Sequence, residues 1–117
     1  MEIKIKRAKS SDWKIIQRIQ KNDGFKHAYY LTKKRILKLF KRGEIFYLAF
    51  LKNKAVAFTS VDFEIRARLH FISVLKEFHQ KGIGSILLNK IVNDSKKEDI
   101  KVYILSQRKK QIKWVIF

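Results

Sequence analysis

The segment from Phe78 to Ser85 carries the residue types whose spacing is best suited to chemistry. Its sequence is FHQKGIGS, so it holds two of the four glycines in the chain, and a helical pattern begins within it at Gly82. The first turn of a helix has unpaired N–H groups and the positive end of the helix dipole, and glycine lets backbone amides approach an anion without obstruction by a Cβ. This segment is therefore predicted to cradle phosphate, and Lys81 adds a full positive charge.

Two common phosphate loops do not fit this segment. A P-loop requires the pattern Gly-x-x-x-x-Gly-Lys-Ser/Thr, which the sequence lacks. A dinucleotide-binding turn requires a third glycine three residues after Gly84, where Leu87 stands. On loop spacing alone, an ordinary strand-to-helix turn, with glycines for tight packing, stays open as the alternative.

The elements that must position this loop are predicted from hydrophobic periodicity and helix caps. The run from Ile45 to Leu51 is apolar on both faces and indicates a central strand, whereas Ser60 to Ile65 alternates as a strand with one solvated face does. The expected order is β-α-α-β-β-β-α-β with a short C-terminal tail, which predicts an α+β fold with a mixed, mainly antiparallel sheet flanked by helices. The expected strands are 3–7, 45–51, 60–65, 69–74 and 100–105, and the expected helices are 12–22, 32–43 and a third from 82 onward.

The composition predicts one globular domain over residues 1–117. Apolar residues make up 46% of the sequence, which suffices for a core, and no apolar run reaches the roughly 18 residues that a membrane span needs. The charged start lacks the apolar core of a signal peptide, so a cytoplasmic location is expected. The absence of Cys excludes disulfides, thiolate metal sites and a Cys nucleophile, and the three His residues are too scattered to predict a metal site.

The chain is strongly basic, with 28 Lys and Arg against 10 Asp and Glu and a formal net charge of +18. Such a field favours anionic partners, including nucleic acid, acidic lipid surfaces and nucleotide phosphates. It would repel polybasic acceptors and suits neutral or acidic ones. An AT-rich genome that encodes surface positions with Lys is the alternative explanation, because the Lys residues are spread along the chain.

The stretch from Val74 to Leu88 resembles the acetyl-CoA signature of the GNAT superfamily of N-acetyltransferases, in which a strand ending in Val precedes a loop Arg/Gln-x-x-Gly-x-Gly/Ala and a helix. The resemblance implies acetyl-CoA as cosubstrate and an amine acceptor, which is a small molecule, a protein N-terminus or a lysine. It also implies that loop amides hold the CoA pyrophosphate and that backbone groups near Val74 pair with pantetheine. His79 departs from the family pattern, since Arg or Gln usually stands there. The implied cofactor-binding residues are Val74, His79, Gln80, Lys81, Gly82, Ile83, Gly84, Ser85 and Gln107.

Amine acetylation needs a base or a water relay to collect the amine proton and an acid for the leaving thiolate. His70 is the first candidate base, because relatives such as the arylalkylamine acetyltransferases carry a catalytic His in a similar Leu-His-x-x-x-Val stretch. Period-2 geometry places His70 on the same strand face as Val74. Glu64 is the second candidate, because family members also use a strand carboxylate. The alternatives are a hydrogen-bonded sheet histidine at 70 and an ordinary polar strand residue at 64.

The resemblance identifies no acid in this chain. Family members commonly place an Asn after the fifth strand and a Tyr further along, in a helix near the CoA sulfur, and Gln107 and Trp114 stand at those places. Trp donates only an indole N–H and cannot act as a general acid. The final helix and strands of the family are abbreviated here, so the segment from Ile112 to Phe117 is expected to pair with a second chain and form a homodimer.

Two functions other than acetyl transfer to an amine stay open on the sequence. One is a non-catalytic CoA-binding domain, which the missing acid suggests. The other is a basic nucleic-acid-binding module, which the charge and the aromatic residues Trp13, Tyr29 and Tyr30 suggest, although no nucleic-acid motif is recognisable.

Overall fold

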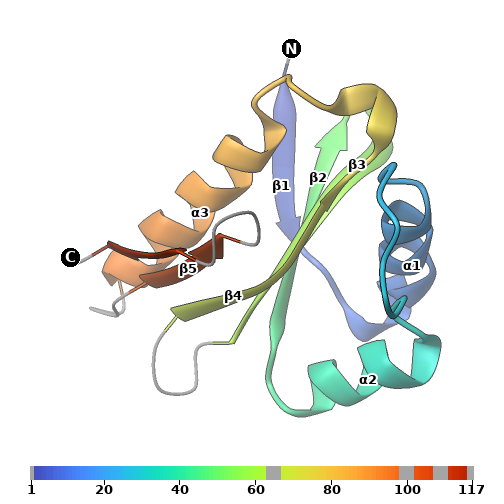
Figure 1. Cartoon of the computed structure of the whole chain (residues 1–117), viewed down its shortest axis with the longest axis horizontal. Coiled ribbons are helices and arrows are strands. Elements are labelled where there is room, and N and C mark those ends of the chain that lie inside the picture. Colours follow the sequence, from blue (N-terminus) through green and yellow to red (C-terminus); the bar gives the residue numbers. More distant parts are fainter. Residues whose placement is uncertain (1, 63–66, 98–101, 107–110, 116–117) are drawn as a thin grey trace.

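In the described part of the chain, six strands form one sheet in the order in which they occur along the sequence (Figure 1). The structure is a computed structural model that describes residues 2–62, 67–97, 102–106 and 111–115. All neighbouring strands are antiparallel except β4 and β5, which are parallel. The predicted mixed, mainly antiparallel sheet is therefore confirmed. The strands are β1 (Ile3–Arg7), β2 (Ile45–Leu51), β3 (Lys54–Asp62), β4 (Ala67–Val74), β5 (Val102–Ser106) and β6 (Gln111–Val115).

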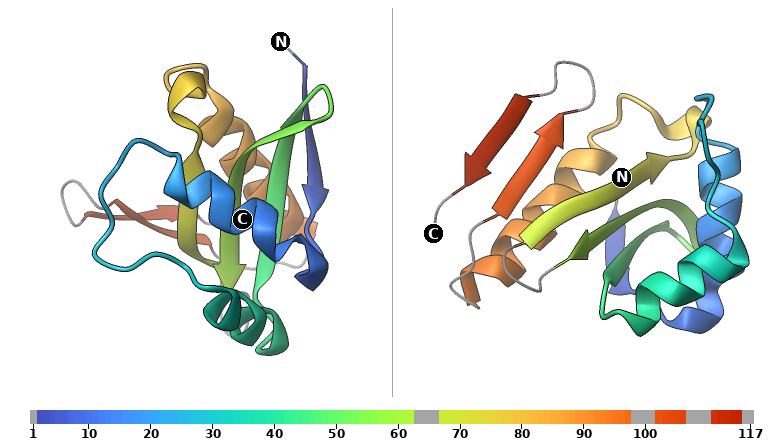
Figure 2. Two further views of the ribbon diagram at one scale, coloured as in Figure 1. Left: turned by 90° about the vertical axis from the view of Figure 1, so that its right-hand side faces the viewer. Right: turned by 60° about the horizontal axis from the view of Figure 1, so that its bottom comes forward.

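Helices cover both faces of the central strands. Helices α1 (Trp13–Lys21) and α2 (Lys33–Lys41) lie on one face and α3 (Ile83–Lys97) lies on the other (Figures 1 and 2). The predicted cap of α2 is confirmed, because the Thr32 side chain accepts a hydrogen bond from the Arg35 N–H. Two short 3-10 turns, η1 (Ser10–Asp12) and η2 (Lys76–Phe78), precede α1 and follow β4.

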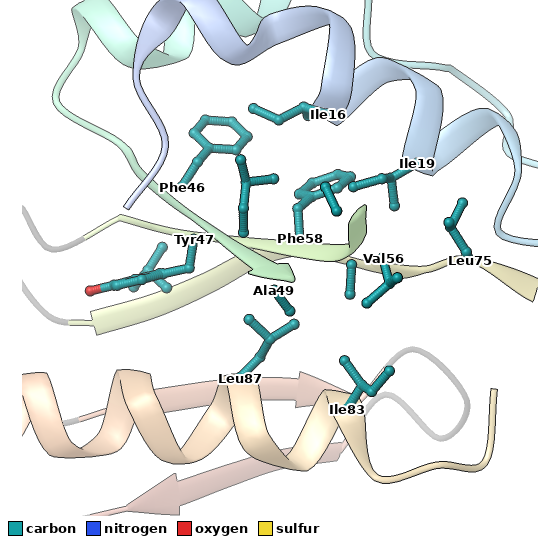
Figure 3. Close-up of a cluster of buried hydrophobic side chains, with 14 of the residues drawn as sticks. Ile16, Ile19, Phe46, Tyr47, Ala49, Val56, Phe58, Leu75, Ile83 and Leu87 are labelled. Atoms are coloured by element: carbon teal, nitrogen blue, oxygen red, sulfur yellow. The ribbon is translucent and has the colours of Figure 1, made fainter. Parts of the chain in front are cut away.

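The core lies between these layers, on both sides of β2 and β3. Ile16 and Ile19 of α1 pack on one side, and Ile83 and Leu87 of α3 pack on the other (Figure 3). One expectation about this region was wrong. The third predicted strand was placed at 60–65 with one solvated face, but β3 begins at Lys54, and its residues from 55 to 61 are all buried. Ser60 was expected on the solvated face and is buried, because helices cover both faces of the sheet here. Residues 63–65 of this predicted strand lie outside the described residues.

The segment after β5 also differs from its prediction. Gln111–Val115 forms β6, which pairs antiparallel with β5 of the same chain, Tyr103 lying opposite Trp114 in the register. The partner of this segment is therefore β5 of the same chain, where the sequence analysis expected a second chain. The backbone groups on this edge of β5 are thereby paired within the chain.

Tyr47 provides a test of how β2 and α3 are joined. Its hydroxyl donates a 2.7 Å hydrogen bond to Asp94 Oδ2, and Lys90 lies 3.3 Å from the other carboxylate oxygen. Burial, together with the Asp94 carboxylate, raises the pKa of the Tyr47 phenol well above its ordinary value of about 10. Because the folded-state pKa is the higher one, this stabilisation is complete below about pH 10 and is lost as the pH rises further.

We therefore expect Tyr47→Phe to lower the free energy of unfolding by about 1 kcal/mol at pH 7, the typical contribution of one hydrogen bond. The difference between the two proteins should shrink above about pH 10, because only the wild type then loses the contribution of this phenol. Urea denaturation at pH 7 and pH 11 measures this difference in the free energy of unfolding between the wild type and Tyr47→Phe. If the difference is the same at both pH values, the stabilising role of the Tyr47 hydrogen bond to Asp94 is contradicted.

Candidate functional site

The predicted phosphate loop has the backbone geometry of an anion cradle. Helix α3 begins at Ile83, and its first hydrogen bond runs from the Ile86 N–H to the Gly82 carbonyl at 3.1 Å, which leaves the N–H groups of the first turn available. Gly82 has φ +78°, and Gln80 also has a positive φ, of +61°. A Cβ added to Gly82 would meet no atom within 4 Å, so open space adjoins the start of the helix. The first turn contains no acidic residue, so the loop suits a phosphate or pyrophosphate.

His79 contributes to this loop in a way that its place in the sequence did not show. Its Nε2 donates a 2.9 Å hydrogen bond to the carbonyl of Val74, at the end of β4. Its ring stacks on Phe25 at 5.5 Å. The side chain thus ties the loop to the strand end and to the segment between α1 and α2. Ile83 is buried, so only its backbone can face a ligand, whereas Gln80, Lys81 and Ser85 are exposed.

Among the described residues, the edge of β4 next to the loop has no strand partner on its β5 side. The two strands pair only at Ala67 with Val102 and at Arg68 with Tyr103. Beyond these pairs β4 and β5 diverge, and the start of α3 lies toward the end of β4 (Figure 2, right). On its other side, β4 stays paired with β3 as far as Val74. An extended ligand with amide groups can pair with such an open edge as an added strand would.

A β-bulge lies at the start of this open edge. Ser60 pairs with Phe71 and Val61 pairs with Leu69, so His70 is an extra residue without a partner on β3. A bulge breaks the alternation of side chains and turns the extra residue in a new direction.

The sequence analysis placed His70 on the same face of the sheet as Val74, and the bulge makes this expectation wrong. The Cδ1 of Ile72, which has the same parity as Val74, lies 3.8 Å from the place that a Cβ on Gly84 of α3 would take. His70 instead lines a pocket with Leu39 of α2. His70 and Ile72 therefore lie on opposite faces of the sheet, and the rule that placed His70 on the same face as Val74 does not hold across the bulge.

His70 is paired with a buried carboxylate that the sequence analysis missed. Its Nδ1 lies 2.8 Å from Oε1 of Glu44, and the Glu44 side chain is only 6% exposed. With Glu44 ionised, the proton of the imidazole sits on Nδ1, which leaves Nε2 free to accept a proton. Such a carboxylate also compensates the positive charge that the ring acquires when it takes a proton. The pair therefore has the arrangement of an oriented general base.

One sequence signal points to Glu44. It stands between Gly43 and the apolar run of β2 and is one of only ten acidic residues in the chain. Gly43 has φ +92°, which ends α2, and the Glu44 N–H donates to the Leu39 carbonyl at 3.0 Å. These backbone constraints direct the carboxylate inward, toward β4.

A pocket of about 110 Å³ opens at the Glu44–His70 pair. Its walls combine two guanidinium groups, two carboxylates, the imidazole and one apolar side chain. These are Arg42, Arg68, Glu44, Asp62, His70 and Leu39.

The remaining candidates of the sequence analysis lie elsewhere in the fold or outside the described residues. Glu64 and Gln107 lie outside the described residues, and Trp114 belongs to β6 rather than to a helix. Of the aromatic residues proposed for nucleic acid, Tyr29 is 90% exposed, while the Trp13 ring lies beneath the ammonium groups of Lys14 and Lys33. Within the described ranges, no group of three His, Cys, Asp or Glu could hold a metal ion, and no helix is long and apolar enough to cross a membrane.

Comparison with known proteins identifies the family of the chain. The sequence model of the acetyltransferase (GNAT) family matches residues 11–113. Among solved structures, a ribosomal-protein alanine N-acetyltransferase from Escherichia coli is similar with a TM-score of 0.78 and 17% identity, over 88% of this chain and 66% of that one. This chain thus spans just under two thirds of that enzyme. No curated protein matches the sequence.

Two other similar structures have a CoA molecule bound. The PaiA N-acetyltransferase from Thermoplasma acidophilum, in complex with coenzyme A, has a TM-score of 0.78 and 19% identity, over 95% of this chain and 83% of that one. A predicted acetyltransferase from Clostridium acetobutylicum, with acetyl-CoA, has a TM-score of 0.71 and 15% identity, over 94% and 84%. Identities this low show a shared fold.

Proposed function

Because the chain belongs to the acetyltransferase (GNAT) family, we propose that it transfers an acetyl group from acetyl-CoA to an amine. The observation that supports this most strongly is the open edge of β4, which connects the anion cradle at α3 to the bulge at His70. At about 3.3 Å per residue, His70 lies roughly 13 Å along the strand from Val74. The edge therefore joins a phosphate site to a base.

The backbone of the loop would hold the cosubstrate. N–H groups between Gln80 and Ser85 would bind the CoA pyrophosphate, and Lys81 would add charge from the loop surface. The open edge of β4 between Leu69 and Val74 would pair with the pantetheine amides as an added strand. Acetyl-CoA supplies an activated thioester at the far end of this chain of contacts.

His70 would act as the base at that end, with the acceptor approaching from the face that His70 shares with α2. The amine nitrogen forms a bond to the carbonyl carbon, and the carbon–sulfur bond breaks. The amine proton passes to Nε2 of His70, while Nδ1 keeps its hydrogen bond to Glu44. The leaving thiolate takes a proton from solvent, so this scheme needs no acid from Trp114 or Gln107.

Thermal denaturation with acetyl-CoA and a thiol-release assay with an amine panel together test the proposal. A ligand present at 100 times its dissociation constant adds about 2.7 kcal/mol to stability, which corresponds to a rise of roughly 10 °C in the midpoint for a chain of this size. We expect such a rise with acetyl-CoA, and amine-dependent release of CoA. Absence of the shift at millimolar acetyl-CoA would refute the cosubstrate. A shift without turnover on any amine would instead favour the non-catalytic CoA-binding domain.

A further inference from the structure

We propose that the pocket at Glu44 and His70 is an acceptor subsite for small amino acids, compounds that carry a carboxylate a few bonds from a primary amine. The inference rests on the proposed acetyl transfer, since it names the acceptor of that reaction. It is carried by the opposite charges that line this one pocket, which lies against the proposed base.

The amine end is marked by Glu44. Its side chain is 6% exposed, and its Oε1 is taken by His70. Its Oε2 is also buried and has no hydrogen-bond partner among the described residues. A buried carboxylate oxygen without a donor is costly, and an ammonium group is the donor that satisfies it best. An amine held there as ammonium would first lose one proton to solvent through His70, and the neutral amine would then attack the thioester and pass its second proton to the same imidazole.

The anionic end is marked by Arg42 and Arg68. Both line the pocket and both are exposed. Guanidinium groups match carboxylates in geometry and charge. Arg42 follows α2 and Arg68 lies near the start of β4, so the two approach the Glu44–His70 pair from different elements.

Size and net charge limit the acceptor further. A pocket of about 110 Å³ is smaller than a cavity of about 150 Å³ that holds a benzene ring, so it suits an acceptor of few heavy atoms. A formal net charge of +18 attracts a molecule with an exposed carboxylate and repels polybasic peptides. A simple alkylamine would leave both guanidinium groups unused.

The test compares glycine, L-alanine and β-alanine with ethylamine, which lacks the carboxylate, and propionate, which lacks the amine. Thiol release gives kcat/KM for the amines, and saturation-transfer NMR on the protein with bound CoA reports binding of all five compounds without turnover. At least one amino acid should have a kcat/KM about tenfold or more above that of ethylamine. Arg42→Gln and Arg68→Gln should each raise its KM about tenfold with little change in kcat. Arg35→Gln, on α2 and outside the pocket, removes the same charge and should leave KM unchanged.

Two results would overturn the subsite. If ethylamine and the amino acids are acetylated equally well, the acceptor class is wrong although the acetyltransferase stands. The saturation-transfer signal of at least one amino acid should be weakened more by Arg42→Gln or Arg68→Gln than by Arg35→Gln. If it is not, the subsite is wrong, whether or not turnover occurs. Failure of the proposed function itself is separate, because it appears as missing acetyl-CoA binding in the thermal assay.

Discussion

Replacing Gly82 by Asp should abolish detectable binding of acetyl-CoA. Gly82 immediately precedes the first residue of α3, where N–H groups and the helix dipole favour negative charge. The new side chain would occupy the open space beside Gly82 and place a carboxylate against the pyrophosphate. Loss of even two charge-assisted hydrogen bonds would weaken binding by at least about 100-fold. Isothermal titration calorimetry with acetyl-CoA measures this directly.

Gly82→Asn is the matched control for this substitution. Asn has nearly the shape of Asp and adopts a positive φ more readily than most residues, so it tolerates the φ of +78° at this position. It carries no charge. Both variants should therefore pay a similar steric and conformational cost, and the difference between them isolates the electrostatic effect. If Gly82→Asp binds acetyl-CoA as tightly as Gly82→Asn does, the loop does not hold the pyrophosphate.

The sequence was most informative where structure depends on neighbouring residues. The cap at Thr32, the helix end at Gly43 and the switch to helical period at Gly82 are local signals, and each is found where it was expected. The phosphate loop belongs to this group, because its geometry follows from glycines at a helix start. The element order up to β5 follows for the same reason.

The features that the sequence did not reveal depend on contacts between distant segments. Nothing in the stretch around His70 distinguishes a bulged strand from a regular one, because the extra residue is defined only by the register with β3. The partner Glu44 is 26 residues away from His70 in the chain. The pairing of β6 with β5 likewise depends on which edge is open once the sheet has formed. Half of the candidate site, the base and its orienting carboxylate, is therefore a product of tertiary structure.

The second large effect is expected at His70 itself. His70→Ala should lower kcat by about 10²–10⁴-fold, the usual contribution of a general base, while the affinity for acetyl-CoA stays the same. Imidazole added to the His70→Ala variant should restore part of the activity, because it can enter the space left by the side chain. A hydrogen-bonded sheet histidine without a role in proton transfer predicts the opposite pattern, a change in stability with kcat unaltered. Single-turnover kinetics with and without imidazole separates the two.

Glu44→Gln tests whether the carboxylate positions the base. A Gln side chain keeps the size of Glu but can donate its amide hydrogens to Nδ1, which would place the imidazole proton on Nε2 and block that atom as a base. We therefore expect kcat to fall by about 10²-fold or more, with the affinity for acetyl-CoA unchanged. The variant should also show an altered pH profile of kcat. Combined with His70→Ala it should cause little further loss of kcat, because the carboxylate acts on proton transfer through the ring, whereas its contact with the acceptor ammonium would appear in KM. Additive losses of kcat in the double variant would mean that Glu44 contributes to the chemical step independently of His70, and would contradict its role in positioning the base.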